Sequence, residues 1–371
     1  MKVRYSYLPQ QFADIDGLLA QIKVLVQSGD FTLGKPLEEF EARFARLIGS
    51  SHAIGVGSGT DAIKLSLKAL GIGHGDEVIT AANTFIATVG AIAELGARPV
   101  FVDCTDTFCM DVAQVPAAIT KRTRAIVPVH YTGYMTDMAQ LVPMAEAHHL
   151  PIVEDACQAI LAAQDGRKAG TWGQAGAFSL HPLKNLNVWG DGGVIVTSND
   201  KLAASLRLMR NHGMRNRDEI AVLGCNSRLD TLHAVVGNWL IGSTEEITET
   251  RIANAAYYDE HLGRLPQITV PPRGGNARRV FHLYTLMAQE RDALLAHCLE
   301  RGIEAKVHYP IPVYLQEGLR HLGHHRGDFP RTDFQAANGI SFPCDQHLSR
   351  AEQDYVIETV TNFYASRGAR G

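Results

Sequence analysis

The order of short apolar segments along the chain limits the folds that it can adopt. Seven such segments, four to seven residues long, are separated for the most part by longer stretches with helical spacing. They are residues 53–56, 77–80, 99–103, 124–130, 151–155, 176–180 and 193–197. Apolar segments of this length are typical of buried strands. Their alternation with helices predicts an α/β fold with a mostly parallel sheet and right-handed crossovers.

The length of the chain and a change of pattern after residue 244 predict two domains. A chain of 371 residues is longer than one hydrophobic core usually serves. A helix over residues 245–264 is expected to lead away from the first part. Strands of the second part are expected at residues 280–287, 305–309 and 339–343. We therefore expect a large domain over residues 1–244, N-terminal helices included, and a smaller C-terminal α+β domain over residues 245–371.

Composition and charge argue against several classes of protein. Hydrophobic residues make up 46% and charged residues 20% of the chain, as in a soluble globular protein. The net charge of -4 gives no electrostatic reason to expect nucleic acid or an anionic membrane as a partner. No apolar run approaches the roughly 20 residues that span a bilayer, and the first residues lack the apolar core of a signal peptide.

Cysteine and histidine residues form no pattern typical of a metal site. The spacing of the six cysteines matches neither a zinc site nor a disulfide framework, so reduced thiols in a cytoplasm are expected. A His-rich segment at residues 320–326 also carries two arginines, which oppose a cation, and its spacing matches no standard ligand set even with Asp328. We expect a solvated loop there and no metal.

One lysine lies in the polar, glycine-rich link between the last two of these segments. Most lysines are exposed and have no specific role, so a solvated loop residue is the default interpretation of Lys184. However, Pro182 fixes the backbone before it, and the glycines between residues 190 and 193 allow a ligand to lie close to the main chain. Ser179 adds a small hydroxyl at the same strand end. This neighbourhood suits a lysine that forms a Schiff base.

The link after the first strand has two interpretations. Residues 57–61, Gly-Ser-Gly-Thr-Asp, lead directly into an apolar helix. Amides in the first turn of a helix lack internal acceptors and the macrodipole is positive there, which favours a phosphate site. Alternatively, Ser58 or Thr60 only caps the helix, an arrangement worth about 1 kcal/mol.

The lysine segment resembles that of the DegT-type sugar aminotransferases, which are pyridoxal 5'-phosphate (PLP) enzymes of fold type I. Their pattern is Ser-Phe-x-Pro-x-Lys-Asn-Leu-x-x-x-Gly-Asp-Gly-Gly, and this chain matches it at Pro182, Lys184, Asn185, Leu186 and residues 190–193. The resemblance covers nearly the whole chain. It implies the fold of a type I PLP-dependent transferase, in which Lys184 first carries the cofactor as a Schiff base and then acts as base and acid in the proton shift.

The same resemblance implies contacts with the cofactor phosphate and ring. Gly59 and Thr60, with Ser58 before them, match the family's Gly-Thr-x-Ala phosphate loop. Phe85 lies in a segment similar to Thr-Phe-x-Ala-Thr, in which the aromatic ring covers one face of the pyridine. Ser179 is expected to face the same space. Without the resemblance, an aromatic residue at a helix start would be assigned to the core.

The strand at residues 151–155 delivers two carboxylates to its end. Neighbours on a strand point to opposite faces, so only one of Glu154 and Asp155 can enter a given pocket. Without further evidence, a Glu-Asp pair at a strand end would be expected only to cap the following turn. The segment is similar to the family's Glu-Asp-Ala-x-Gln/His-Ala. This similarity implies that Asp155 pairs with the protonated ring nitrogen, the cation that a buried carboxylate needs, and that Gln158 reaches the ring oxygen or the phosphate side.

Two later segments also match the family. Asn226 lies in a segment similar to Asn-x-Arg-Met/Leu-Asp, whose asparagine in relatives reaches the PLP phosphate of the neighbouring subunit. The resemblance therefore implies a homodimer with shared active sites. His308 and Tyr309 match a Val-His-Tyr-Pro segment on the substrate side of the cleft. A turn residue at 226 and a structural histidine at 308 remain the alternatives.

The resemblance implies an aminotransferase that moves an amino group, expected from L-glutamate, to a ketone of a nucleotide-linked sugar. The Lys-Asn-Leu and Gly-Asp-Gly-Gly pattern is closer to enzymes that act at C3 of a dTDP-linked 3-keto-6-deoxy sugar than to the pattern common for C4. A 4-keto sugar and a cyclitol remain alternatives. A PLP-dependent sugar dehydratase is disfavoured because a histidine replaces the lysine there, and a regulatory protein because Asp155, Gln158 and Lys184 are all present.

Overall fold

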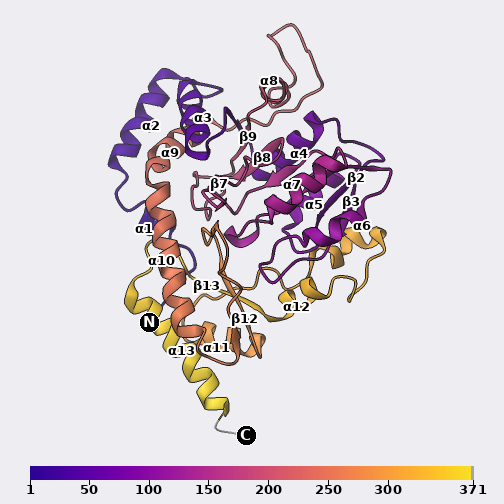
Figure 1. Cartoon of the computed structure of the whole chain (residues 1–371). Coiled ribbons are helices and arrows are strands. Elements are labelled where there is room, and N and C mark those ends of the chain that lie inside the picture. Colours follow the sequence, from indigo (N-terminus) through magenta and orange to yellow (C-terminus); the bar gives the residue numbers. More distant parts are fainter. Residues whose placement is uncertain (369–371) are drawn as a thin grey trace.

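A mixed β-sheet lies at the centre of the chain in the computed structural model, which describes residues 1–368 (Figure 1). In spatial order its strands are β3 (Arg98–Val102), β2 (Glu77–Ala81), β4 (Thr123–Val127), β5 (Val153–Asp155), β8 (Ala175–Ser179), β9 (Gly193–Thr197) and β1 (His52–Val56). Parallel bridges from Ile126 to Ile152 and from Val129 to Asp155 join the three-stranded and four-stranded parts. Only the pairs that include β9 are antiparallel, so the predicted mostly parallel sheet is confirmed.

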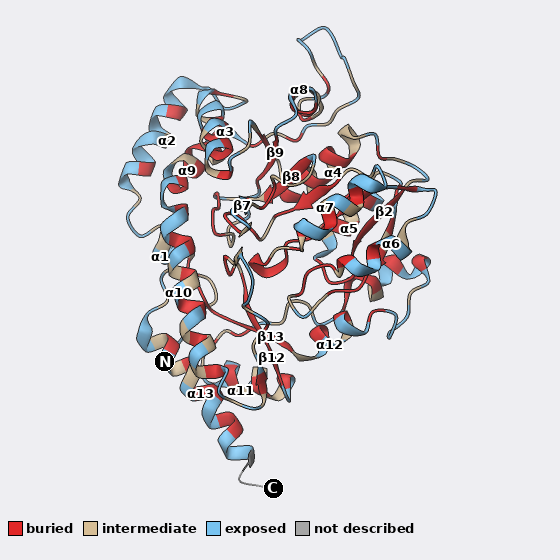
Figure 2. Cartoon of the chain, in the orientation of Figure 1, coloured by how far each residue is buried: buried red, intermediate tan, exposed pale blue. Residues whose placement is uncertain are grey.

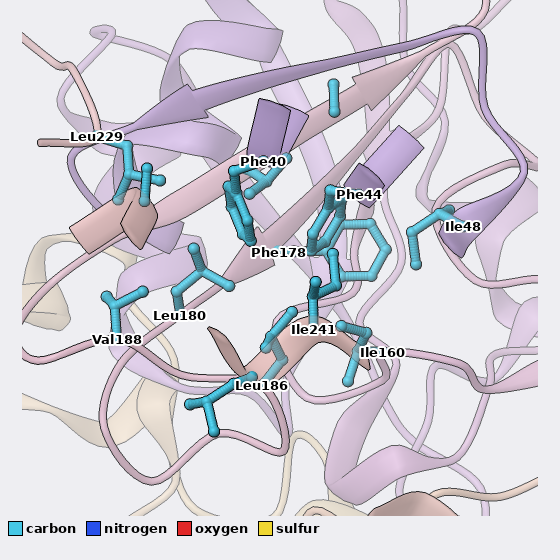
Figure 3. Close-up of a cluster of buried hydrophobic side chains, with 14 of the residues drawn as sticks. Phe40, Phe44, Ile48, Ile160, Phe178, Leu180, Leu186, Val188, Leu229 and Ile241 are labelled. Carbon is cyan, nitrogen blue, oxygen red and sulfur yellow. The ribbon is translucent and has the colours of Figure 1, made fainter. Parts of the chain in front are cut away.

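Alternate residues of the strands face two different apolar cores. On β9, Val194 and Val196 pack in one cluster and Ile195 in another on the opposite face, as the period of two requires. Figure 3 shows the first cluster, in which Phe44 lies edge-on against Phe178 of β8 with ring centroids 5.3 Å apart. Because both faces are covered, the strands are buried while the outer sides of the helices are exposed (Figure 2).

Helices form a layer on each face of the sheet. The first face is covered by α2 (Asp16–Ser28), α3 (Lys35–Ile48), α6 (Val115–Ala118), α7 (Met138–Ala147) and α9 (Thr231–Leu240). The second face is covered by α4 (Gly59–Ala69), α5 (Ile86–Ala93) and α8 (Asp200–Met209). The short α1 (Leu8–Gln11) precedes both layers. Within residues 1–368, no helix combines the length and the apolar character needed to cross a membrane.

The C-terminal part has its own apolar core beside an antiparallel sheet. That sheet consists of β10 (Ile268–Thr269), β12 (Tyr284–Ala288) and β13 (Gly339–Phe342). Its core is formed with α10 (Thr244–Leu262), α11 (Arg291–Glu300) and α13 (Arg350–Gly368). Val3 packs in the same core, so the N-terminal segment lies against the C-terminal part. A second small sheet joins β6 (Ala163–Gln164) to β7 (Arg167–Lys168) and to β11 (Ala277–Arg278).

One segment of the C-terminal part returns to the large sheet. The carboxylate of Asp103, just after β3, accepts hydrogen bonds from the backbone amides of Arg331 (2.8 Å) and Thr332 (2.9 Å) at the start of α12 (Pro330–Asn338). From the same helix, Gln335 accepts a 2.8 Å hydrogen bond from the side chain of Asn83. These contacts hold the chain that follows His308 and Tyr309 beside the start of α5.

The expected strand over residues 305–309 is wrong. Only Lys306 pairs with β13, through reciprocal backbone hydrogen bonds with Ser341, and the chain then leaves the sheet. Pro310 and Pro312 follow, and proline lacks the amide that a ladder needs. The carbonyl of His308 instead accepts a 3.0 Å hydrogen bond from the hydroxyl of Tyr131.

Packing on α2 generates a stability prediction with a matched control. Leu18 is fully buried in the first cluster, whereas its neighbour Leu19 is 45% exposed. Leu18→Ala should lower the free energy of unfolding by about 2–5 kcal/mol because it leaves a cavity in a packed core. Leu19→Ala should change it by about 0.5 kcal/mol or less. Guanidinium unfolding curves measure both, and equal losses would contradict this assignment of the buried face.

Candidate active site

A cavity of about 310 Å³ lies at the carboxyl ends of β5 and β8, where the C-terminal part meets the large sheet. Ten of the eleven predicted site residues line it: Ser58, Gly59, Thr60, Phe85, Asp155, Gln158, Ser179, Lys184, His308 and Tyr309. The exception is Asn226. The carboxylate of Asp155 and the amine of Lys184 therefore share one cavity on the same side of the sheet.

The loop after β8 holds the backbone of Lys184 in place. Its carbonyl accepts 3.0 Å hydrogen bonds from the hydroxyl of Tyr7 and the side-chain amide of Asn187. Its Nζ lies 3.4 Å from Nε2 of His282. Burial lowers the pKa of Lys184 below the usual value, while the negative charges of Cys157, when ionised, and Asp155 act in the opposite direction. The lowered pKa favours a neutral, nucleophilic amine.

Glu154 and Asp155 point to opposite sides of β5, as expected for neighbours on a strand. Glu154 is fully buried away from the cavity, where it lies 2.9 Å from His130 and accepts hydrogen bonds from the amides of Gly170, Trp172 and Gly173. Its role is therefore to tie the segment after β7 to the sheet. Asp155 is left as the carboxylate at this strand end that faces the cavity.

The environment of Asp155 fits a cationic ring. Its side chain is buried and accepts hydrogen bonds from the hydroxyl of Thr88 (2.7 Å) and the amide of Cys157 (3.1 Å). Within residues 1–368, no lysine, arginine or histidine nitrogen lies within 4.0 Å of this carboxylate. A buried carboxylate with neutral donors alone still lacks a counter-charge. The protonated pyridine nitrogen of PLP would supply it.

The start of α4 offers open amides beside the cavity. Ser58 caps the helix, because its hydroxyl accepts a 3.0 Å hydrogen bond from the amide of Asp61. The amides of Gly59 and Thr60 precede the first helical hydrogen bond and have no acceptor within the helix. A Cβ at Gly59 would lie 2.8 Å from Sγ of Cys157, so only glycine fits there. The capping and phosphate-binding interpretations are therefore compatible, and the residues fit a phosphate group.

Aromatic and imidazole groups form another part of the cavity wall. Phe85, 47% exposed, lies at the N-cap of α5 with its ring centroid 5.5 Å from that of Tyr309. Nδ1 of His308 lies 3.0 Å from the hydroxyl of Ser341. Burial lowers the pKa of His308 to about 4, with a smaller contribution from Lys306, so its imidazole is neutral at pH 7. Burial, aided by Asp155, raises the pKa of Tyr309 to about 12 and keeps its hydroxyl protonated.

Gln158 and Asn226 differ in their surroundings. Gln158 lines the cavity, and its Oε1 accepts a 2.7 Å hydrogen bond from the amide of Thr132. Asn226 is exposed outside the cavity of its own chain and forms an isolated β-bridge with Asn211. A contact between Asn226 and the neighbouring subunit stays a prediction.

Sequence reasoning missed several residues of the cavity wall, among them Tyr5, Tyr7, Arg251 and His282. Tyr5 and Tyr7 come from the N-terminal segment, Arg251 from α10 and His282 from the link before β12. Each lies far in sequence from the lysine segment and in no motif that we identified. Burial of Arg251 on α10 cannot be recognised from spacing alone.

The lowered pKa of Lys184 generates a pH-dependent prediction. Because burial disfavours the ammonium form, this lysine should become neutral below the pH of 10.5 at which an ordinary lysine is half-neutral. The rate at which the cofactor-free protein forms a covalent adduct with pyridoxal phosphate should therefore rise with pH and level off below that value. Stopped-flow absorbance measures the rate, with Lys184→Ala as the control. A midpoint at or above that of free Nα-acetyl-lysine would contradict the assignment.

Comparisons with known proteins agree with this geometry. The model of the DegT/DnrJ/EryC1/StrS aminotransferase family matches residues 14–361. A pleiotropic regulatory protein from Geobacillus stearothermophilus is 42% identical over 368 residues, which cover 98% of this chain and 99% of that protein. A dTDP-3-amino-3,4,6-trideoxy-alpha-D-glucose transaminase from Streptomyces venezuelae is 40% identical over 352 residues, which cover 95% of this chain and 92% of that protein.

A solved structure is similar over almost its whole length. The crystal structure of S. venezuelae DesV in complex with a ketimine intermediate has a TM-score of 0.95, is 39% identical, and matches 98% of each chain. The fold predicted from the sequence, that of a type I PLP-dependent transferase, is thereby confirmed. The family predicted from the lysine segment is confirmed as well: this chain belongs to the DegT/DnrJ/EryC1/StrS aminotransferase family.

Proposed function

We propose that this protein is a PLP-dependent aminotransferase that moves an amino group from L-glutamate to the C3 keto group of a dTDP-type nucleotide-linked keto-deoxy sugar. The observation that carries the proposal is the cavity in which the amine of Lys184 and the carboxylate of Asp155 face the same space. When bound, PLP supplies the electron sink that stabilises negative charge on the substrate carbon. Membership in an aminotransferase family supports the reaction class.

Some residues of the cavity would hold the cofactor, and Lys184 would transfer protons. Asp155, positioned by Thr88, would keep the ring nitrogen protonated. The amides of Gly59 and Thr60 would hold the phosphate at the positive end of α4. Lys184, with its lowered pKa, would accept and return the proton at the reacting carbon.

The remaining predicted residues would complete the walls around the ring and the substrate. Phe85 would cover one face of the ring, and Gln158 and Ser179 would line its edge. His308 and Tyr309, both neutral at pH 7, would contact the substrate, with Tyr309 next to Phe85.

The C3 position rests on similarity to named transaminases. The S. venezuelae relative is named for a 3-amino sugar linked to dTDP, and an Acidithiobacillus ferrooxidans relative, 39% identical, is named as a UDP-N-acetyl-3-dehydro-alpha-D-glucosamine 3-aminotransferase. A 4-keto sugar or a cyclitol is the second candidate substrate. The presence of Lys184 disfavours a dehydratase. It also favours catalysis over the regulatory role that the name of the G. stearothermophilus relative suggests.

We further infer a homodimer of two-domain subunits in the cytoplasm. The separate apolar core of the C-terminal part supports a division near residue 244, with domains 1–244 and 245–371. The exposure of Asn226 outside its own cavity supports a contact with a neighbouring subunit. The six cysteines, free of disulfides in the structure, are compatible with a reducing compartment.

A spectroscopic experiment tests the reaction. The PLP-loaded protein should be yellow, lose its colour with L-glutamate, and regain it when a dTDP-linked 3-keto-6-deoxy sugar is added. Parallel additions of 4-keto sugars and cyclitols identify the acceptor by the rate at which the colour returns. Lys184→Ala is the control, since it removes the amine that holds the cofactor. Colour that persists with every amino donor would refute the aminotransferase assignment.

Mixing of inactive subunits tests the shared site. Lys184→Ala and Asn226→Ala proteins should each have low activity. If Asn226 serves the neighbouring subunit, random exchange of subunits should restore about one quarter of the wild-type activity, because a mixed dimer has one intact site. Exchange without recovery, shown by mass spectrometry of mixed dimers, would place both residues in the same subunit's site.

A further inference from the structure

A buried arginine in the cavity wall has an unused hydrogen-bonding edge. Arg251 of α10 is 3% exposed and lines the cavity. Its Nη1 donates a 3.3 Å hydrogen bond to the carbonyl of Phe281, but Nε and Nη2 have no partner within residues 1–368. A buried guanidinium with unpaired N–H groups is costly for a folded protein. Such an edge can bind an acceptor that enters the cavity.

The chemistry of the missing acceptor can be inferred from other arginines of the chain. Arg273 uses the same two nitrogens on Asp259, with Nε at 2.7 Å and Nη2 at 2.9 Å from the carboxylate oxygens. Arg122 also directs Nε and Nη2 to a carboxylate, although both donate to one oxygen, Oε1 of Glu77. The Nε and Nη2 edge of a guanidinium matches the spacing of two carboxylate oxygens. The free edge of Arg251 is therefore suited to a carboxylate.

Two contacts place Arg251 close to Lys184. Its guanidinium lies 5.1 Å from the ring centroid of Tyr7, whose hydroxyl donates to the carbonyl of Lys184. The carbonyl that accepts from Arg251 belongs to Phe281, and the next residue, His282, lies 3.4 Å from Nζ of Lys184. The guanidinium is thus one side chain away from the reacting amine, on the wall formed by α10 and the N-terminal segment.

The charges around Arg251 leave this edge available. Lys306 lines the same cavity, with Nζ 4.6 Å from the ring centroid of Tyr5, and adds a second positive charge. Asp345 is the carboxylate of the cavity wall that could compete. Its Oδ1 accepts a 2.9 Å hydrogen bond from the amide of His347, and within the described chain it lies beyond 4.0 Å from the guanidinium nitrogens. Burial raises the pKa of Asp345, which weakens it further as an anion.

We propose that Arg251 binds a carboxylate of the amino donor and thereby selects amino acids over simple amines. This inference rests on the proposed aminotransferase function and adds the residue that recognises the donor. The keto-deoxy sugar proposed above carries no carboxylate, so Arg251 would act in the half reaction with the amino donor and not in the half reaction with the sugar. The carbonyl of Phe281 and the ring of Tyr7 position the guanidinium for this task.

The two half reactions of the holoenzyme separate these roles. In Arg251→Gln, the L-glutamate concentration that gives half the maximal rate of colour loss should rise roughly tenfold to hundredfold, the loss expected for a hydrogen-bonded ion pair. Arg251→Lys keeps the positive charge but loses the two parallel N–H donors. Its half-maximal L-glutamate concentration should therefore lie between those of the wild type and Arg251→Gln. The rate of colour return when keto sugar is added to the pyridoxamine-phosphate form should change less than about threefold in both variants.

A binding measurement provides a readout that does not depend on turnover. Glutarate carries two carboxylates and no amine, so it should bind the PLP-loaded wild type without reacting. Calorimetry should give an affinity at least tenfold weaker for Arg251→Gln. Arg291→Gln is the matched control, because Arg291 is also buried (7% exposed) but donates to the carbonyl of Gly339 outside the cavity. It should keep the glutarate affinity of the wild type.

Several outcomes would overturn the assignment. Unchanged glutamate and glutarate affinities in Arg251→Gln would mean that the guanidinium is only structural. A selective loss of the sugar half reaction would mean that Arg251 binds the nucleotide sugar instead. Loss of glutarate affinity in Asp345→Asn equal to that in Arg251→Gln would mean that the two residues act as a pair. By contrast, a wild type whose colour persists with glutamate would refute the aminotransferase function itself.

Discussion

A buried carboxylate that lacks a cation within the described chain is the constraint on which this site depends. Asp155 accepts hydrogen bonds from Thr88 and Cys157, yet no lysine, arginine or histidine nitrogen of residues 1–368 lies within 4.0 Å of its carboxylate. A ligand that supplies the opposite charge stabilises a buried carboxylate of this kind. The order of strands β4, β5 and β8 brings this carboxylate and the amine of Lys184 to the same end of the sheet. The protonated ring of PLP would supply the positive charge for Asp155.

The C-terminal part provides the low-polarity surroundings that make these groups reactive. The contacts of α12 with Asp103 hold the chain after Tyr309 next to Phe85, and the N-terminal segment covers the cavity with Tyr7. Burial by these elements lowers the pKa values of Lys184 and His308. The same burial leaves Arg251 with an unpaired edge. Burial in one cavity therefore lowers the pKa of Lys184, keeps the imidazole of His308 neutral and leaves the guanidinium of Arg251 free to bind an anion.

Local patterns predicted the strands of the large sheet because each strand is buried on both faces and reads as a short apolar segment. They failed at residues 305–309, where an apolar and aromatic segment resembles a strand but two prolines prevent further pairing. The motifs around Gly59, Asp155 and Lys184 indicated cofactor chemistry, since each is a local sequence at a strand end or helix start. Tyr7, Arg251 and His282 carry no such local signal.

The sequence by itself determined the class of fold, the family, and ten residues that share one cavity, because these depend on short segments with fixed local geometry. It also predicted that Glu154 and Asp155 would face opposite ways, since strand period alone requires it. Only the tertiary structure showed that Asp155 has no lysine, arginine or histidine nitrogen within 4.0 Å among residues 1–368, and that Arg251 has a free edge in the same cavity. Burial and missing partners depend on contacts between distant segments, and spacing along a chain does not encode them.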